Sequence, residues 1–163
     1  MNVAARLGTA DDAVVVDDIA SIIREELAPL RGGAVLLAQH GPRSLPGTRT
    51  FVGSIDDVVV GYADVSVETL SDGSLLGVIR DLAVLLGARG VGVGEAILDQ
   101  VIEYCRGQGC RGIDSVALPG TRETKNFFET FGFTARLLVV HSSLVPDAEP
   151  EALGTSSAGS DPS

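Results

Sequence analysis

Cysteine and histidine are scarce in this chain of 163 residues. Its two cysteines, Cys105 and Cys110, and its two histidines, His40 and His141, form no local cluster. Two cysteines cannot supply a disulfide framework, and a structural zinc site needs four Cys or His ligands. We therefore expect reduced thiols, no metal and a cytoplasmic location.

Basic residues are also few, since 12 Lys and Arg stand against 22 Asp and Glu, for a formal net charge of −10. Domains that bind nucleic acid carry the opposite sign because they neutralise phosphates, so we expect no nucleic-acid partner. An acidic surface is compatible with a cationic substrate such as an amine.

Long apolar runs are missing as well. No run approaches the roughly 18 residues of a membrane-spanning helix, and the first residues, MNVAAR, lack the apolar core of a secretory signal, so we expect no membrane partner. Apolar residues still make up 45% of the chain, which is enough for one folded core. Residues 144–163 are rich in Pro, Ser and acids without Lys or Arg. We predict a folded domain over 1–143 and a disordered acidic tail over 144–163.

Hydrophobic periodicity predicts a mixed order of helices and strands. The chain begins with helical spacing from Asp11 or Asp12 to Leu30, while residues 34–38 fit either a strand or a short helix. The elements expected after that are three hairpin-linked strands over 50–55, 58–68 and 75–85, a helix over 94–106, a strand over 113–118, a helix over 122–131 and a strand over 134–142. This order predicts an α+β fold with a mixed, mostly antiparallel sheet flanked by helices.

The stretch from Arg80 to Glu95 is the most informative, because a strand enters a turn with alternating glycines that open a helix. Glycines expose backbone N–H groups, and with a helix N-terminus these groups form a cradle for phosphate. A dinucleotide site would need G-x-G-x-x-G after the first strand, whereas Gly90, Gly92 and Gly94 give G-x-G-x-G in mid-chain. A third interpretation is that the glycines only allow a tight turn.

Arg89, Gly92 and Gly94 match the Arg/Gln-x-x-Gly-x-Gly/Ala signature, and the segment resembles the acetyl-CoA motif of the GCN5-related N-acetyltransferase (GNAT) family. Asp81–Val84 is similar to the end of that family's central strand, and Phe127–Phe133 resembles its aromatic helix ending in Gly-Phe. The resemblance covers residues 50–142 and is nearest to small actinobacterial members.

The resemblance implies a GNAT-like sheet whose strands splay around an acyl-CoA cleft. The pantetheine arm would pair with the strand end, the glycine loop would hold the pyrophosphate, and a backbone N–H near the strand end would stabilise the oxyanion. Arg122 and Lys125 would reach phosphates, although solvated helix charges explain them equally well. The implied binding residues are Leu82, Ala83, Val84, Arg89, Gly90, Val91, Gly92, Val93, Gly94, Glu95, Arg122, Lys125 and Phe128.

The usual acid and base of the family are missing. Phe128 stands where a Tyr often protonates the leaving thiolate, and Val78 and Val116 stand where relatives place a Glu base. The substitute bases are Glu68 and Asp81, against structural or solvated roles for both carboxylates. Tyr62 and Tyr104 are candidate acids that also fit a core edge, and His141 fits a surface position.

The resemblance implies an acetyltransferase that moves acetyl from acetyl-CoA to a primary amine by direct attack in a ternary complex. Two alternatives remain open: a regulatory module that binds acyl-CoA without turnover, and a structural domain with an empty cleft. The acceptor pocket would be built by the N-terminal helix, residues 34–48 and the hairpin at 69–74. The exposed sheet edges allow a homodimer.

Overall fold

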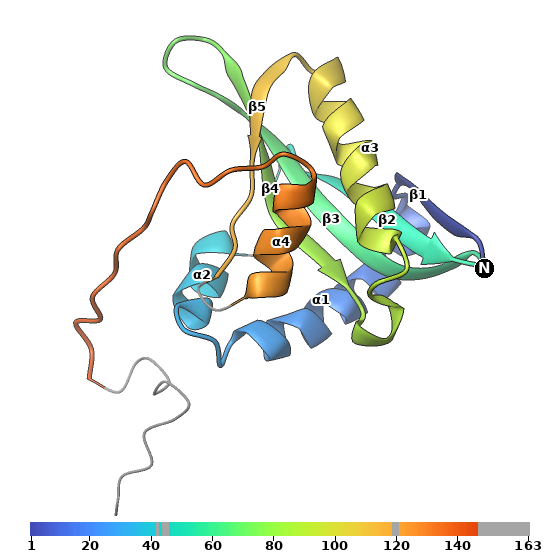
Figure 1. Ribbon diagram of the computed structural model, residues 1–163, viewed down its shortest axis with the longest axis horizontal. Coiled ribbons are helices and arrows are strands. Elements are labelled where there is room, and N and C mark those ends of the chain that lie inside the picture. The colour runs from blue at the N-terminus through green and yellow to red at the C-terminus, as the bar shows by residue number, and fades with distance from the viewer. Residues whose placement is uncertain (42, 44–45, 119–120, 147–163) are drawn as a thin grey trace, which may run out of the picture.

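One sheet with helices on both faces organises the part of the chain that the structure describes, residues 1–41, 43, 46–118 and 121–146 (Figure 1). In this computed structural model, the described elements follow the order β1 (Val3–Leu7), η1 (Ala10–Asp12), α1 (Ala13–Leu27), α2 (Gly33–His40), β2 (Arg49–Ile55), β3 (Val58–Thr69), β4 (Leu75–Val84), η2 (Leu86–Ala88), α3 (Val93–Gly107), β5 (Cys110–Asp114) and α4 (Arg122–Thr130). The predicted α+β class is confirmed.

The strands lie in sequence order, β1-β2-β3-β4-β5. The first four are antiparallel to their neighbours, and β5 is parallel to β4 after the crossover through α3. The β4–β5 ladder ends at the pair Val78–Asp114, although β4 continues to Val84. The two strands therefore splay, as the family resemblance implied.

Two apolar layers hold the helices to opposite faces of the sheet. Alternation along β2 places Phe51 in the layer with α3 and α4, and Val52 in the layer with α1. The α3 layer is centred on Ile97 and Leu98, both fully buried. Gly53 permits this close approach, because a Cβ there would lie 2.7 Å from side-chain atoms of Ile97. No helix among the described residues is long and apolar enough to cross a bilayer.

The N-terminal region contains two elements that periodicity did not define. The undecided run at 34–38 belongs to helix α2. The short strand β1 pairs with β2 and was not predicted, because its five residues, Val-Ala-Ala-Arg-Leu, show no clear alternation of apolar and polar side chains. Residues 147–163 of the predicted tail lie outside the described residues.

Two strand predictions near the C-terminus are wrong: one strand has other bounds than predicted, and the other is not in the described sheet. The strand expected at 113–118 is β5 at Cys110–Asp114, because residues 115–118 follow the splay and have lost the β4 ladder. The strand expected at 134–142 is absent from the described sheet. That segment leaves the body after α4 without joining a backbone ladder of the described sheet (Figure 1).

Candidate functional site

The glycine loop joins the end of β4 to the first turn of α3. Gly90 and Gly92 have positive φ angles of 79° and 98°, and Gly92 is the N-cap of α3. A Cβ built on either glycine would meet nothing within 4 Å, so both backbones face open space. The first N–H groups of α3, from Val93 to Glu95, have no partners inside the helix. The loop thus has the geometry of an anion cradle.

Arg89 fixes this loop instead of projecting into it. Its Nε donates to the carbonyl oxygen of Val84 at 2.7 Å, and its Nη2 contacts Glu26 Oε2 of α1 at 2.9 Å. Arg89 therefore ties the loop both to the last residue of β4 and to α1.

The strand end beside the loop is open along one edge. Beyond Val78, no described strand pairs with the β5-facing side of β4. Ala83 is buried against α1, whereas Leu82 and Val84 are partly buried on the α3 side. An extended ligand could pair with this stretch of backbone as an added strand does.

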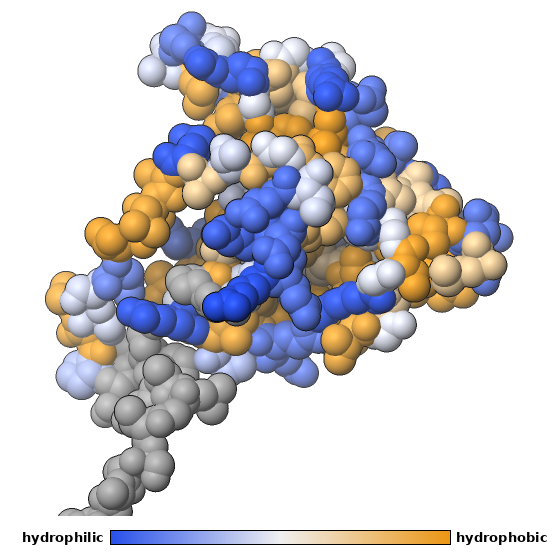
Figure 2. All heavy atoms as spheres, viewed as in Figure 1, coloured by the Kyte–Doolittle hydropathy of each residue, from blue (hydrophilic) through white to orange (hydrophobic). Residues whose placement is uncertain are grey.

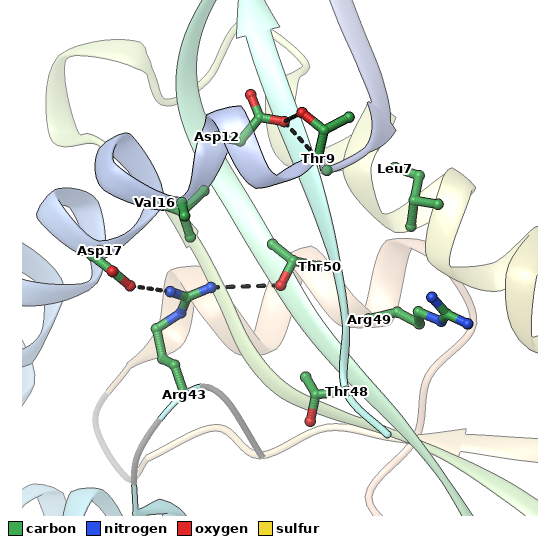
Figure 3. Close-up of a pocket in the computed structure, with 11 residues that line it drawn as sticks. Leu7, Thr9, Asp12, Val16, Asp17, Arg43, Thr48, Arg49 and Thr50 are labelled. Carbon is green, nitrogen blue, oxygen red and sulfur yellow. Dashed lines mark hydrogen bonds and ion pairs between the residues drawn. The ribbon is translucent and has the colours of Figure 1, made fainter. Parts of the chain in front are cut away.

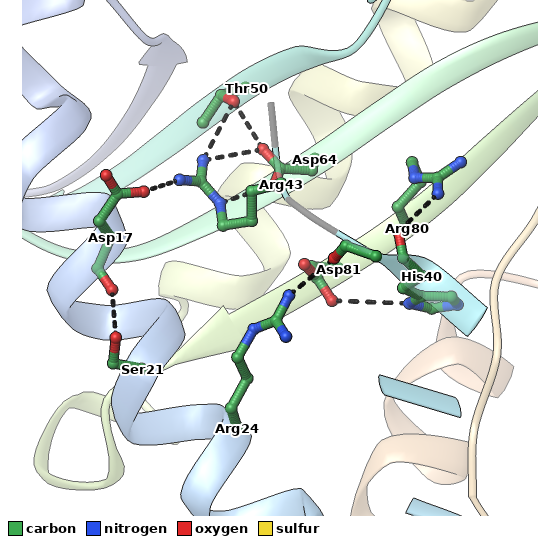
Figure 4. Close-up of polar contacts among 10 residues, drawn as sticks. Asp17, Ser21, Arg24, His40, Arg43, Thr50, Asp64, Arg80 and Asp81 are labelled. Carbon is green, nitrogen blue, oxygen red and sulfur yellow. Dashed lines mark hydrogen bonds and ion pairs between the residues drawn. The ribbon is translucent and has the colours of Figure 1, made fainter. Parts of the chain in front are cut away.

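A β-bulge re-aims the side chains of β4 at the splay. Asp81 lies opposite Asp64 and Ile79 lies opposite Val65, so Arg80 is the extra residue. The Nη2 of Arg80 donates to the carbonyl oxygen of His40 at 3.1 Å, and Asp81 Oδ1 lies 4.0 Å from His40 Nδ1 (Figure 4). The bulge therefore brings a histidine of α2 beside Asp81. Sequence reasoning missed this pair because the two residues are 41 positions apart.

A buried ion pair lies next to this site. Asp64 is 1% exposed, and it accepts hydrogen bonds from Arg43 Nε at 2.8 Å and from Thr50 Oγ1 at 2.5 Å (Figure 4). The Arg43 guanidinium also contacts Asp17 and lies 4.9 Å from the centre of the Tyr62 ring. Burial raises the pKa of the Asp64 carboxyl, and the bonds from Arg43 and Thr50 oppose that rise.

Of the two predicted bases, only Asp81 lies at the splay. Glu68 is exposed on β3 and pairs with Leu76, four residues along β3 from Asp64. At about 3.4 Å per residue, Glu68 lies on the order of 13 Å along the strand from the position opposite Asp81. The structure therefore does not bring the two carboxylates together.

The tyrosines belong to the core. Tyr62 is 2% exposed beneath α1, and burial raises the pKa of its phenol. Tyr104 packs against the ring of Phe51, with the centroids 5.5 Å apart. These placements favour the core interpretation over an acid role for either residue.

Helix α4 presents its aromatic residues differently from expectation. Phe128 is buried and packs against Phe133 at 5.2 Å, whereas its neighbour Phe127 lies beside the glycine loop. A Cβ on Gly94 would be 3.2 Å from the Phe127 ring. Arg122 and Lys125 are exposed, and Lys125 pairs with Glu129 at 3.6 Å. Phe127 therefore lies next to the glycine loop, although the resemblance had pointed to Phe128 as the binding residue.

The structure also places the two valines that stand where relatives have a Glu base. Val78 lies at the last β4–β5 pair, and Val116, 54% exposed, follows β5. Neither can accept a proton.

A cavity of about 550 Å³ opens between α1 and β2 on the face away from α3 (Figure 3). Its charged lining is balanced, because Asp12 and Asp17 face it together with Arg43 and Arg49. Residues 34–48 contribute Arg43 and Thr48, as expected of an acceptor pocket, but the hairpin at 69–74 does not line it. The charged lining of this cavity therefore does not favour a cationic ligand over an anionic one.

Comparisons with known proteins agree with this architecture. A putative acetyltransferase from Pyrococcus furiosus superposes with a TM-score of 0.72 at 18% identity, covering 88% of this chain and 100% of that one. An acetyltransferase from Trypanosoma brucei superposes with a TM-score of 0.66 at 23% identity, covering 88% of this chain and 100% of that chain. An aminoglycoside N-acetyltransferase in complex with CoA superposes with a TM-score of 0.66 at 18% identity, covering 85% of this chain and 97% of that chain. At these identities the likeness concerns the fold.

No protein with a curated description matches the chain. The model of the acetyltransferase (GNAT) family matches residues 17–133, well over half of the chain, and includes most of α1, the bulge, the glycine loop and α4. The chain therefore belongs to the acetyltransferase (GNAT) family.

Proposed function

We propose that the protein is an N-acetyltransferase that moves acetyl from acetyl-CoA to a primary amine by direct attack in a ternary complex. The observation that carries this proposal is the glycine loop at the N-terminus of α3, open at Gly90 and Gly92, beside the unpaired end of β4. One of the similar structures, the aminoglycoside N-acetyltransferase, was solved with CoA, which supports the same co-substrate here.

The residues present fit an acyl-CoA molecule. The N–H groups of Gly90 to Glu95 hold the pyrophosphate, and the backbone of Leu82, Ala83 and Val84 pairs with the pantetheine arm. A backbone N–H of this strand end stabilises the oxyanion that forms on the thioester carbonyl. Arg122 and Lys125 supply positive charge from α4. Phe128 contributes packing, since it is buried.

The pair formed by His40 and Asp81 removes the proton from the amine. A primary amine with a pKa near 10.4 is almost wholly protonated at neutral pH, so it must lose a proton before attack. The imidazole of His40 is 23% exposed beside the bulge and can accept that proton, while Asp81 stabilises the imidazolium. Glu68 remains the alternative base suggested by the sequence. The CoA thiolate leaves without an acid, because a thiol pKa of about 8.5 makes it a fair leaving group.

The proposal is tested by measuring CoA release from acetyl-CoA over a panel of amines, including aminoglycosides, polyamines and lysine peptides. We expect turnover with at least one amine, and its loss in Gly92→Glu, whose carboxylate would oppose the pyrophosphate. Gly92→Ala is the matched control, because it carries the same backbone strain at φ 98° without the charge. No turnover with any amine would contradict the proposal.

A non-catalytic module that binds acyl-CoA is the second candidate. It is favoured by Phe128, which is buried and has no hydroxyl, and by the two valines at the base positions. Acetyl-CoA binding without release of CoA for every amine would establish this candidate instead.

Several finer proposals rest on the sequence. They are the cytoplasmic location, the likeness to small actinobacterial members, the absence of metal, nucleic-acid and membrane partners, and the division into a domain at 1–143 and a tail at 144–163. The acidic composition supports a cationic acceptor, whereas the balanced cavity beside α1 does not identify one.

A further inference from the structure

Two arginine side chains lie beside the His40–Asp81 pair and have no part in the proton transfer. Arg24 belongs to the last turn of α1, and Arg80 is the extra residue of the β4 bulge. Most charged side chains of the described chain are exposed, as on the hydrophilic outer face of α4 (Figure 2), whereas these two arginines are partly buried. A guanidinium keeps its charge at any physiological pH, so its partners in a partly buried position need an explanation.

Within the described part of the chain, both guanidinium groups bond to backbone carbonyls. Arg24 Nη2 donates to the carbonyl oxygen of Gly41 at 3.0 Å, and Arg80 Nη2 donates to that of His40 at 3.1 Å (Figure 4). Neither group forms an ion pair with a described carboxylate. A guanidinium has five N–H donors, so each side chain keeps several donors for a further acceptor.

The two guanidinium groups converge on the end of α2. Their acceptor carbonyls belong to consecutive residues, so standard bond lengths put the two Nη2 atoms within about 11 Å of each other. The contact between His40 Nδ1 and Asp81 Oδ1 lies at the same place, and Arg24 reaches from α1 toward it (Figure 4). An anion bound by the arginines would therefore lie only a few bonds from an amine bound at His40.

The charges around this place are balanced and separated. Asp64, which lies opposite Asp81 in the sheet, and Asp17 of α1 both contact Arg43. At the end of α2, by contrast, Arg24 and Arg80 have no such partner. A second positive charge on the acceptor would face two guanidinium groups there. A carboxylate would instead accept charge-assisted hydrogen bonds from both, while the ammonium of the same molecule faces Asp81.

We propose that the acceptor is a small amino acid, a primary amine with a carboxylate a few bonds away, and that Arg24 and Arg80 bind this carboxylate. The inference rests on the proposed function, because it names the class of amine. His40 takes one proton from the ammonium. The amine nitrogen then bonds to the thioester carbonyl carbon, the C–S bond breaks, and a second proton leaves the nitrogen and ends on the CoA thiolate.

A purely structural role for the arginines leads to a different expectation. Arginine side chains bond to the last carbonyls of helices, and Arg24 and Arg80 do so at the end of α2. A cap of this kind acts equally on every acceptor. A carboxylate site distinguishes an acceptor that carries the charge from one that lacks it.

The test compares α-, β- and γ-amino acids with their primary amides, by steady-state CoA release from acetyl-CoA on the wild-type protein. The amide keeps the size of the acceptor and removes the negative charge. It also lowers the pKa of the ammonium, so more of the amide is unprotonated, and this difference works against the expected result. We expect kcat/KM for the best amino acid to exceed that for its amide by about tenfold or more.

Variants of the two arginines locate the effect. Arg24→Gln and Arg80→Gln should each raise KM for that amino acid about tenfold, with kcat within about threefold and an unchanged KM for the amide. Arg106→Gln is the matched control, because it removes the same charge from a side chain of α3 that is 72% exposed, and its KM should not change. Calorimetric titration with acetyl-CoA shows whether each variant keeps its fold.

Several results would overturn the proposal. Turnover of the amide, or of a diamine such as putrescine, as efficient as that of every amino acid would do so on the wild type alone, and it would leave the proposed function standing. Preference for phosphoethanolamine over all amino acids would assign the arginines to a phosphate. Equal rises in KM for amino acid and amide in both variants would reduce the arginines to a cap of α2. No CoA release with any amine would overturn the proposed function as well.

Discussion

Arg43 and Asp64 form an ion pair beneath α1, with Nε 2.8 Å from Oδ2 and the aspartate side chain 2% exposed. A carboxylate so deep is tolerated only with a partner, because an unpaired buried charge has lost its hydration. The pair also holds Arg43 against β3, at the residue that lies opposite Asp81 in the sheet. It therefore supports the wall of the candidate acetyl-transfer site.

Removal of Arg43 should destabilise the fold. We expect Arg43→Met to lower the free energy of unfolding by about 3–5 kcal/mol, because Asp64 would remain buried and unpaired. The measurement is urea unfolding at pH 7. Asp17→Asn is the control, since Asp17 contacts the same guanidinium from an exposed position and should cost under about 1 kcal/mol. Equal losses in the two variants would show that the buried pair is not the stabilising one.

Asp12 should make stability depend on pH in the acid range. Hydrogen bonds from Arg6 and from the Thr9 backbone lower the pKa of the Asp12 carboxyl from 3.8 to about 2. Because the folded pKa is depressed, this stabilisation is present above pH 3.8 and is lost as the pH falls through about 2. We expect Asp12→Asn to lose about 1–2 kcal/mol at pH 6 and almost nothing at pH 2. Urea unfolding at the two pH values checks this, and a deficit independent of pH would contradict it.

Periodicity and turn chemistry predicted most of the fold. Helices α1 and α3 were predicted because apolar residues, Ile19 and Ile97 among them, recur at helical spacing on faces that are buried. The β3–β4 hairpin was predicted from the turn residues at 71–74. The strand over 134–142 was not a failure of propensity. Leu137–Val140 have strand character, but propensity alone does not determine whether a segment pairs with the edge of a sheet.

The candidate site was predicted in part for a similar reason. The glycine loop is local in sequence, so its residue types and spacing revealed it. The contact between His40 and Asp81 depends on how α2 packs and on one extra residue in β4. Neither feature has a sequence signal, and the loop residue Arg89 was assigned to the ligand although its guanidinium holds Val84.

Arg89 should act by positioning the loop. Arg89→Gln loses the bond to the Val84 carbonyl, and we expect acetyl-CoA affinity to fall about tenfold, with little change in thermal stability because the side chain is 38% exposed. Glu26→Gln keeps that bond and removes only an exposed ion pair, so its affinity should change less than twofold. Calorimetric titration of both variants provides the comparison. A larger loss in Glu26→Gln than in Arg89→Gln would show that α1, not β4, orders the loop.

His40 should matter most at neutral pH. We expect His40→Gln to lower kcat about a hundredfold at pH 7, within the range for a general base. The deficit should shrink by pH 9, because roughly ten to a hundred times more of the amine is then already unprotonated. Asp81→Asn should show the same trend with a smaller loss, and His141→Gln should have no effect. Steady-state CoA release between pH 6.5 and 9.5 gives these values, and a deficit that does not vary with pH would assign His40 a structural role.

The central claim is that the loop from Arg89 to Gly94 is an acyl-CoA cradle. The most direct test is calorimetric titration of the wild-type protein with acetyl-CoA, with NADH as the control ligand. Our account predicts binding of acetyl-CoA at one site per chain with micromolar affinity, and no heat from NADH. Absence of acetyl-CoA binding, or equal binding of NADH, would contradict the account and leave the glycines as a turn between β4 and α3.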